Sequence, residues 1–547
     1  MLGRAARASD SDGGDHLRGD LDLDRRAYRD RFAWHPEPEL IGIRDAALNR
    51  GALERAGAEV WDAALHYLFD HALERATGEP IGYDEMRALY YGTQGGPSAA
   101  PRDPARLSDL LDEFGTRLAP HMLNSWHPRQ FSYFTPPPLV ASIAGETLAQ
   151  WLNQGIDVWN CGPAGAFVEE EVIRWLSDLV GYPAEEFGRP TGSFGVLTSG
   201  GVMANFLALT VARDVHLARL LGLDRPPRGG ALEGVRVYVS DQAHFSIARG
   251  LAELGFPDDT LVIVASDDRF RLTAPAVEQA IARDRSAGLV PLAIAAVAGS
   301  TNTGSVDDVP ALAALARREG LWLHVDAAYG AAARLSPRLA PRVPGLELAD
   351  SVTVDPHKWL FQAYDIGALV VRRREELLQT FHRSPEYYRG GDPARADPAD
   401  EPLNFYRYSM EGSRRFRALK LWLSWKHLGT SGLARLVEMT FDVTAHLSRR
   451  ASAMDEFEIS PAEPELSVVC LRHLPFGADT TARFAPDALD AHQDRLATAL
   501  EASGEGWLST TTLHGRTWLR AGNVNYLATE ADVDRLLAAL RKLASGT

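Results

Sequence analysis

Between about residues 130 and 380, short runs of β-branched and apolar residues alternate with stretches rich in Ala, Leu and Arg. The runs include "VRVYVSD", "TLVIVAS", "LAIAAVAGS" and "LWLHVDAA". Each run has the length of one buried strand, and each stretch between them has room for a helix. Strands joined by helices pair in parallel, because the chain must cross back over the sheet. The alternation therefore predicts an α/β fold with a mostly parallel central sheet flanked by helices.

The segments around this region predict four parts in the 547-residue chain. Residues 1–30 are charged and Gly-rich, which predicts a flexible arm. Residues 31–120 carry apolar residues at helical spacing, and residues 121–434 hold the α/β region, ending in a long helix expected over 413–429. Residues 435–547 mix helical patterns with strand-like runs such as "LSVVCLRHL", which predicts a small α+β domain.

Composition excludes several classes of protein. The net charge of −16 disfavours nucleic acid or an anionic membrane as the main partner. Only two cysteines occur, Cys161 and Cys470, so neither a disulfide framework nor a thiolate metal site is expected, and no metal is predicted. The chain has no apolar run of the ~18 residues needed to cross a bilayer, and its N-terminus does not resemble a signal peptide. We expect a cytoplasmic protein.

Open α/β sheets bind ligands beyond the carboxyl ends of their strands, so residues at these ends are candidates for a site. In "VLTSGGVMANFLALTVARD" a strand enters Ser199-Gly200-Gly201 and a helix leaves. Glycines let the backbone approach a ligand, and free N–H groups at a helix start favour an anion. A tight strand-to-helix turn without a ligand explains this motif alone just as simply.

Two more strand ends carry polar groups that have ordinary explanations. His244, in "VYVSDQAHFSIARG", is either a surface imidazole or a ring that lies flat on a planar ligand. Ser300 and Thr301 end a strand in "AVAGSTNTGSVDDV", where hydroxyls often only cap the turn.

Asp326 lies inside the apolar strand of "LWLHVDAAYGAAARL". Burying a carboxylate without a partner is costly, so we expect a cationic partner for it. Ala327 and Ala328 leave room for a flat group against the sheet. The alternative is that Asp326 caps the following helix.

Lys358 follows another strand, in "SVTVDPHKWL". Desolvation by Trp359 and the nearby His357 would lower the pKa of its amine. A neutral amine can attack a carbonyl and form a Schiff base. The alternative is a structural ion pair with Asp355 or Asp326. Together with an anion cradle, a stacking imidazole and a buried carboxylate, a reactive Lys is what pyridoxal 5′-phosphate requires.

Three motifs carry a resemblance to a known family. "SDQAH", "HVDAAYG" and "DPHKWL", in this order and at these separations, resemble the group II pyridoxal-phosphate-dependent amino acid decarboxylases over about residues 120–530. The resemblance implies the PLP-dependent transferase fold type I (aspartate aminotransferase-like) and decarboxylation of an L-amino acid to an amine. It also implies a homodimer with a shared active site, in which residues 31–120 wrap around the partner subunit.

The resemblance also implies a role for each matching residue. Lys358 would form the Schiff base, Asp326 would pair with the pyridine nitrogen, and His244 would stack on the ring and protonate the product carbanion. The other cofactor contacts implied are Ala328 on the opposite ring face, Thr301 beside the cofactor, and Gly201, Val202 and His357 near the phosphate. Val202 departs from the Ser or Thr common in this turn, so Ser199 or Ser300 is expected to supply the missing hydroxyl.

Tyr387, in the loop "SPEYYRGG", bears on the type of reaction. In decarboxylases of this family a loop Tyr at this place protonates Cα after carbon dioxide leaves, whereas relatives with Phe tend to be aldehyde synthases. The Tyr, with Tyr388 as a neighbouring substitute, predicts simple decarboxylation. The alternatives are another pyridoxal-phosphate reaction on the same fold, such as transamination or oxidative aldehyde synthesis, and a non-catalytic scaffold.

The expected substrate pocket contains features of more than one branch of the family. His127, Tyr133 and Phe134 match the aromatic amino acid decarboxylases. Asp157 falls near the place where aromatic-specific members carry an aromatic side chain, and an acid there would favour a polar or cationic substrate. We expect an aromatic L-amino acid, with diamino acids and acidic amino acids left open.

Overall fold

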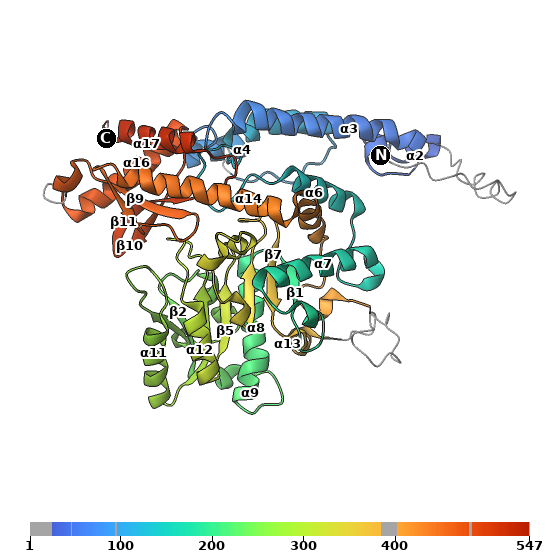
Figure 1. The fold of residues 1–547 in the computed structure, drawn as a ribbon. Coiled ribbons are helices and arrows are strands. Elements are labelled where there is room, and N and C mark those ends of the chain that lie inside the picture. Colours follow the sequence, from blue (N-terminus) through green and yellow to red (C-terminus); the bar gives the residue numbers. More distant parts are fainter. Residues whose placement is uncertain (1–24, 45, 93–95, 384–401, 481–483, 546–547) are drawn as a thin grey trace, which may run out of the picture. The chain divides into compact units, whose positions relative to one another are not determined.

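The computed structural model describes residues 25–44, 46–92, 96–383, 402–480 and 484–545. Most of the predicted arm therefore lies outside the described residues. The chain forms two compact units, Met1–Asn124 and Ser125–Thr547, and each is described by itself (Figure 1). A further division at residue 434 remains a prediction.

The first unit is helical in its described part. Side chains as large as Trp61 and Phe69 are more than half exposed on its longest helix and the turn after it. Asn49 is buried there, and its amide donates to the carbonyls of Glu39 and Gly42 at 2.7 and 2.8 Å. The helices are α2 (Arg25–Arg31), α3 (Ala46–Tyr67), α4 (Tyr83–Tyr91) and α5 (Leu107–Glu113).

The second unit contains a seven-stranded sheet in its described residues, as the alternating pattern predicts (Figure 1). Its order is β1-β7-β6-β5-β4-β2-β3, and only β7 runs antiparallel to its neighbours. Nearly every residue of its central strands is buried. The strands are β1 (Phe194–Thr198), β2 (Val235–Ser240), β3 (Leu261–Val264), β4 (Val290–Val297), β5 (Trp322–Asp326), β6 (Ser351–Val354) and β7 (Gly367–Val371).

Helices cover both faces of this sheet. Helices α8 and α10 follow β1 and β2 and contact each other, whereas α11 and α12 lie on the connections that return through β4 to β5. Because parallel crossovers are right-handed, the two pairs lie on opposite faces. Here α8 is Gly201–Val211, α10 Ser246–Glu253, α11 Ala274–Ser286 and α12 Val309–Glu319; α6 (Val140–Leu152), α7 (Pro163–Val180), α9 (Ala218–Leu220) and α13 (Arg374–Phe381) complete this part.

The chain passes from β2 outward to β3 at the edge of the sheet, and from β4 in the opposite direction to β5. The connections that leave the neighbouring strands β2 and β4 therefore diverge, which makes a topological switch point. The carboxyl ends of β1, β2, β4, β5 and β6 lie at the same edge of the sheet, because β7 alone is reversed. Ligands of open α/β sheets bind at such an edge.

The C-terminal region contains a four-stranded antiparallel sheet of order β10-β11-β9-β8, and "LSVVCLRHL" supplies one of its strands as predicted. Helix α14 does not begin at residue 413 as expected. The backbone of Arg415 forms an isolated bridge with Gly155, and the helix starts at Ala418 and is interrupted at Gly429, where φ is +66°. The elements are α14 (Ala418–Ser452), β8 (Phe457–Ser460), β9 (Val468–His473), α16 (Pro486–Ser503), β10 (Ser509–Leu513), β11 (Arg516–Gly522) and α17 (Glu530–Ala544).

Candidate active site

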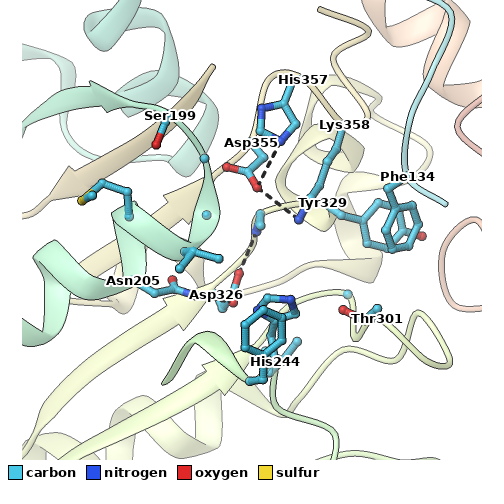
Figure 2. A pocket seen from close by; sticks show the side chains of 18 residues that line it. Phe134, Ser199, Asn205, His244, Thr301, Asp326, Tyr329, Asp355, His357 and Lys358 are labelled. Atoms are coloured by element: carbon cyan, nitrogen blue, oxygen red, sulfur yellow. Dashed lines mark hydrogen bonds and ion pairs between the residues drawn. The ribbon is translucent and has the colours of Figure 1, made fainter. Parts of the chain in front are cut away.

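The carboxyl ends of the parallel strands surround a cavity of about 360 Å³. This volume lies within the range of small-molecule sites, ~300–1,000 Å³. Figure 2 shows Lys358, Asp355, Asp326 and His244 pointing toward the same space. The sequence-predicted residues that line it are Lys358, Asp326, His244, Ala328, Thr301, Gly201, Val202, His357 and Phe134. Their roles there remain predictions.

Lys358 is paired with a carboxylate. Its Nζ lies 3.1 Å from Oδ2 of Asp355, and 23% of its side-chain surface is exposed. Burial by itself lowers the pKa of Lys358, but the charges of Asp355 and Asp326 outweigh it, so the pKa is raised above its ordinary value. The expectation of a lowered pKa was therefore wrong, and the ion pair considered as its alternative is present.

Trp359 does not desolvate Lys358 in the expected way. Its ring is fully buried in the core, where Nε1 donates to Oγ1 of Thr440 at 2.7 Å and the ring stacks on Tyr329. The chain turns sharply after Lys358, and Phe361 adopts a φ of +58°. Lys358 and Trp359 thus point to different surroundings although they are adjacent in sequence.

The turn before helix α8 forms a narrow cradle. A Cβ on Gly201 would lie 2.8 Å from Oδ2 of Asp355 and 3.4 Å from Cβ of Ala328, and one on Gly200 would lie 3.1 Å from Cε1 of His357. Only glycine leaves these positions open to a ligand. The free N–H groups of the first turn of α8 and its dipole favour an anion there.

His357 faces this cradle as a hydrogen-bond donor. Its Nδ1 accepts the N–H of Ile366 at 3.2 Å, so the neutral ring carries its proton on Nε2, which lies 3.7 Å from Oδ2 of Asp355. Burial lowers the pKa of His357, which keeps the ring neutral.

Of the two hydroxyls expected to compensate for Val202, only that of Ser199 belongs to a residue that lines the cavity. The hydroxyl of Ser300 is buried and bonds to those of Thr303 and Ser305 at 2.8 and 2.9 Å. Ser300 therefore closes its own turn, which was the ordinary explanation for a hydroxyl at this place.

Asp326 has amide partners in place of the expected cation. Its Oδ2 accepts from Nδ2 of Asn205 at 2.7 Å, and its Oδ1 accepts from the N–H of Ala328 at 3.1 Å. Hydrogen bonds to N–H donors satisfy a buried carboxylate without a full ion pair.

Asn205 was missed by the sequence reasoning, although the sequence contains a signal. It lies four residues after Gly201 in a helix that is otherwise mostly apolar, and therefore on the same helix face. A buried side-chain amide in such a helix must find partners elsewhere. Its position one turn into α8 places it under the cradle and beside Asp326.

Phe134 is the one predicted substrate contact that lines the cavity. Its ring stacks on the ring of Tyr329, with the two centroids 4.3 Å apart. The guanidinium of Arg520 also contacts the ring of Phe134, 4.7 Å from its centroid. Phe245 also lines the cavity with 54% of its surface exposed, and sequence reasoning did not single it out.

The other predicted substrate contacts do not line this cavity of the single chain. His127 is buried and its Nδ1 accepts the N–H of Arg129 at 3.1 Å. Tyr133 is 54% exposed beside Trp507. Asp157 lines a separate hollow with Arg415 and other residues. Tyr387 and Tyr388 lie outside the described residues.

These residues fit the predicted cofactor. The open Gly200–Gly201 cradle suits a phosphate, Asp326 lies at the far wall to meet a ring nitrogen, and Lys358 supplies an amine between them. Within the described residues there is no group of three or more His, Cys, Asp or Glu side chains that could hold a metal ion. Nor does that part of the chain contain a helix with the length and apolar character required to cross a membrane.

Comparisons with known proteins agree with this site. A family model described as the pyridoxal-dependent decarboxylase conserved domain matches residues 90–474. An aromatic-L-amino-acid decarboxylase of Bacillus atrophaeus is 29% identical over 501 residues, which is 91% of this chain and 96% of that protein. An L-2,4-diaminobutyrate decarboxylase of Rhizobium meliloti (strain 1021) is 33% identical over 438 residues, or 80% and 82% of the two chains.

The chain is also similar to an aldehyde synthase and to a solved structure. A phenylacetaldehyde synthase of Arabidopsis thaliana is 28% identical over 427 residues, covering 78% of this chain and 83% of that protein. The solved structure of Oryza sativa TDC with PLP and tryptamine superposes with a TM-score of 0.80 at 25% identity, covering 92% of this chain and 99% of the other.

Proposed function

The chain belongs to the pyridoxal-dependent decarboxylase family, and on that premise we propose that it converts an aromatic L-amino acid to the corresponding amine and carbon dioxide. The observation that carries the choice of substrate is that the cavity wall includes the aromatic rings of Phe134 and Phe245. An aromatic side chain gains free energy by leaving water for such a wall.

The cofactor of the family, pyridoxal 5′-phosphate, supplies an aldehyde that captures amines and a ring that withdraws electrons from the bond to the departing carboxylate. Lys358 must lose a proton before its amine can attack that aldehyde. Asp355, whose Oδ2 lies 3.1 Å from Nζ, is placed to accept this proton. His357 Nε2, 3.7 Å from Oδ2 of Asp355, and the N–H groups of the first turn of α8 lie on the other side of this carboxylate, where they could donate to a phosphate.

Protonation at Cα and release of an amine are assigned to Tyr387. This part of the proposal rests on the family resemblance of the "SPEYYRGG" loop. If Tyr387 does not deliver its proton, the competing outcome is oxidation by molecular oxygen, which gives an aldehyde, ammonia and hydrogen peroxide. A relative named as a phenylacetaldehyde synthase is the reason to measure it.

Decarboxylation of a diamino acid is a second candidate, favoured by the 33% identity to an L-2,4-diaminobutyrate decarboxylase. Asp157 would be the residue to attract a second amino group. It lines a hollow apart from the main cavity, together with Arg415 and Arg417, whose ion pairs are with other carboxylates. The rings of Phe134 and Phe245 in the wall of the main cavity favour the aromatic candidate.

A homodimer is part of the proposal. Helix α6 exposes Val140, Leu148 and Trp151 within one face, and 61% of the Trp151 surface is accessible. Such apolar faces are typical of contacts between chains. Light scattering should give twice the chain mass for the wild type, whereas Trp151→Lys should shift it toward the monomer. A monomeric wild type would contradict this assignment.

A cytoplasmic location completes the proposal. The two cysteines are free, as is usual in reducing compartments. Activity that fractionated with secreted or membrane material in the source cells would contradict it.

The proposal is tested with purified protein loaded with the cofactor. A panel of L-tryptophan, L-tyrosine, L-phenylalanine, L-2,4-diaminobutyrate and L-glutamate is assayed for carbon dioxide, amine, aldehyde and peroxide. We expect amine and carbon dioxide in equal amounts from an aromatic member. Aldehyde with peroxide would replace simple decarboxylation by oxidation, and turnover of diaminobutyrate alone would select the second candidate.

Two variants serve as controls in that assay. Lys358→Ala should lose the visible absorbance of the bound cofactor together with all products. Lys426→Ala, which alters a half-exposed Lys on α14 outside the cavity, should keep both. If the protein showed a cofactor band but formed no product from a wider panel of amino acids, the family assignment would stand and the proposed activity would be overturned.

A further inference from the structure

Asn205 connects Asp326 and, through Ser246, His244, the two residues expected to contact the ring of the cofactor. Its Nδ2 donates to Oδ2 of Asp326 at 2.7 Å and to Oγ of Ser246 at 2.8 Å. Its Oδ1 accepts from Oγ1 of Thr353 at 2.6 Å and from Nε2 of His324 at 2.9 Å. One buried amide thus has all four of its hydrogen-bonding positions filled, by residues of α10, β5 and β6.

The orientation of this amide follows from its partners. A carboxylate only accepts hydrogen bonds, so the NH₂ group of Asn205 must face Asp326. The same group then faces Ser246, because both contacts are on Nδ2. Turning the amide over would set its oxygen against a carboxylate oxygen, which is repulsive. The network therefore has one arrangement of donors and acceptors.

The proton on His324 is placed by the same logic. Its Nε2 must donate, because it meets Oδ1 of Asn205, so its Nδ1 accepts from Oγ of Ser351 at 2.9 Å. Ser351 in turn accepts from Nε1 of Trp322 at 2.9 Å. Burial lowers the pKa of His324 to about 4, so the ring is neutral at neutral pH.

The chain of hydrogen bonds ends at His244. Ser246 uses its oxygen to accept from Asn205, so its hydroxyl proton is available to Nδ1 of His244, 2.8 Å away. The backbone N–H of Ser246 points to the same nitrogen at 3.3 Å. Two donors on Nδ1 leave the proton of the neutral ring on Nε2.

We propose that Asn205 is a positioning residue that orients Asp326 and, through Ser246, sets His244 as the Nε2–H tautomer. This inference rests on the proposed function only in what the two groups are used for. The Nε2 proton of His244 is then the one presented to bound substrate, and Asp326 keeps its free lone pairs toward the ring nitrogen. A single amide makes the two orientations depend on each other.

Three substitutions separate the branches of the network. Asn205→Ala removes both branches. Ser246→Ala removes only the hydroxyl that reaches His244 and leaves the contact with Asp326. Thr353→Val is the matched control, because it removes one donor to the same amide oxygen and leaves both branches intact.

The tautomer is read from the ¹⁵N shifts of the imidazole nitrogens in the full-length, histidine-labelled chain, without and with pyridoxal 5′-phosphate. The His244 signal is assigned by its loss in His244→Asn. The wild type and Thr353→Val should show a protonated Nε2. In Asn205→Ala the ratio of the tautomers should move toward Nδ1–H by about tenfold, the effect of one buried hydrogen bond. Ser246→Ala should move it in the same direction, because the hydroxyl that donates to Nδ1 is lost and only the backbone N–H remains.

Cofactor affinity provides the second readout, measured by equilibrium dialysis. It should fall several-fold in Asn205→Ala and stay near the wild-type value in Ser246→Ala, since only the first frees Asp326. If Asn205→Ala matched Thr353→Val in both tautomer and affinity, the proposal would be overturned. Should Asn205→Ala fail to fold, as judged by circular dichroism, an unchanged tautomer in Ser246→Ala would overturn it as well.

These readouts do not depend on which product the enzyme forms. The tautomer is observed in the cofactor-free chain, so a result of aldehyde in place of amine leaves this test intact. Conversely, an Nδ1–H tautomer in the wild type would overturn the role of Asn205 and leave the decarboxylase assignment standing.

Discussion

At the end of the cavity lined by Asp326, Asn205 and His244, every polar atom of the Asn205 amide has a partner. At the end formed by Gly200, Gly201, Asp355 and His357, Oδ1 of the buried Asp355 has no hydrogen-bond partner among the described residues. We call these the Asp326 end and the Asp355 end. Lys358 lies between them, and the negative charges of both carboxylates raise its pKa.

The two ends differ in how they are arranged to receive a ligand. At the Asp326 end, neutral groups with fixed donors and acceptors hold one orientation, which is preorganisation by hydrogen bonding. At the Asp355 end, a carboxylate, an ammonium and a set of free N–H groups lie close together and can exchange partners when an anion arrives. At the Asp326 end the hydrogen bonds of Asn205 are all made, which fixes the side chains. At the Asp355 end some hydrogen-bonding groups still lack a partner. Both features can be tested by substitution.

The largest effect should come from the residue between the two ends. Lys358→Ala removes the only amine among the described residues that line the cavity, and we expect product formation to fall by about three orders of magnitude or more. The measurement is kcat/KM on the substrate found in the panel. A loss of less than about tenfold would mean that the amine is not the nucleophile.

The next effect should come from the Asp326 end. Asp326→Asn keeps the shape of the side chain but sets an amide against Nδ2 of Asn205, so one donor loses its acceptor. We expect kcat to fall by about 100-fold and the unfolding free energy by about 1–3 kcal/mol.

A matched variant separates these two consequences. Asp307 is also a buried carboxylate, and it accepts the N–H groups of Leu272 and Val297 at 2.7 and 2.6 Å away from the cavity lining. Asp307→Asn should lose stability by a similar amount and keep kcat. Equal losses of kcat in both variants would indicate that Asp326 acts only through stability.

The Asp355 end should respond to added volume. Gly201→Ala places a Cβ 2.8 Å from Oδ2 of Asp355, inside the cradle, so we expect cofactor affinity to fall by about tenfold or more. Gly57→Ala is the control, because the added Cβ would meet no atom within 4 Å there and alanine is favoured in helix α3. An unchanged affinity in Gly201→Ala would move the phosphate away from this turn.

The smallest effect on catalysis should come from two buried imidazoles, one near Asp326 and one in the C-terminal sheet, which make stability depend on pH. Burial lowers the pKa of both His324 and His473 from 6.5 to about 4. Between these values the unfolded chain binds a proton that the native ring does not, so stability falls as pH falls, by about 1.4 kcal/mol per pH unit for each ring. Chemical denaturation at several pH values measures this slope.

Substitution should separate the two rings. His324→Gln and His473→Gln should each flatten the slope below pH 6.5. Neither substitution should change cofactor affinity by more than Thr353→Val does, because His324 donates to the same oxygen of Asn205 as Thr353 and His473 does not line the cavity. A steeper slope in either variant would show that its imidazole is charged in the native state.

Much of the site was predictable because it lies at the ends of strands. Lys358, Asp326 and His244 follow or end strands that the sequence marks clearly, and the carboxyl ends of parallel strands meet at one edge. The fold type I architecture, the family and the cofactor are confirmed by the comparisons and the sheet order. The partners of Asn205 were not predictable, since they lie 41 to 148 residues away in sequence.

The sequence by itself determined which chemical groups the chain brings to the site, because residue identity and strand periodicity are local properties. Only the tertiary structure decided the protonation state and the partners of these groups. Lys358 was expected to be a desolvated amine with a lowered pKa, yet it is an ion-paired ammonium with a raised one. The physical reason is that a pKa reflects burial and the distances to neighbouring charges in space, and neither can be read from separation along the chain.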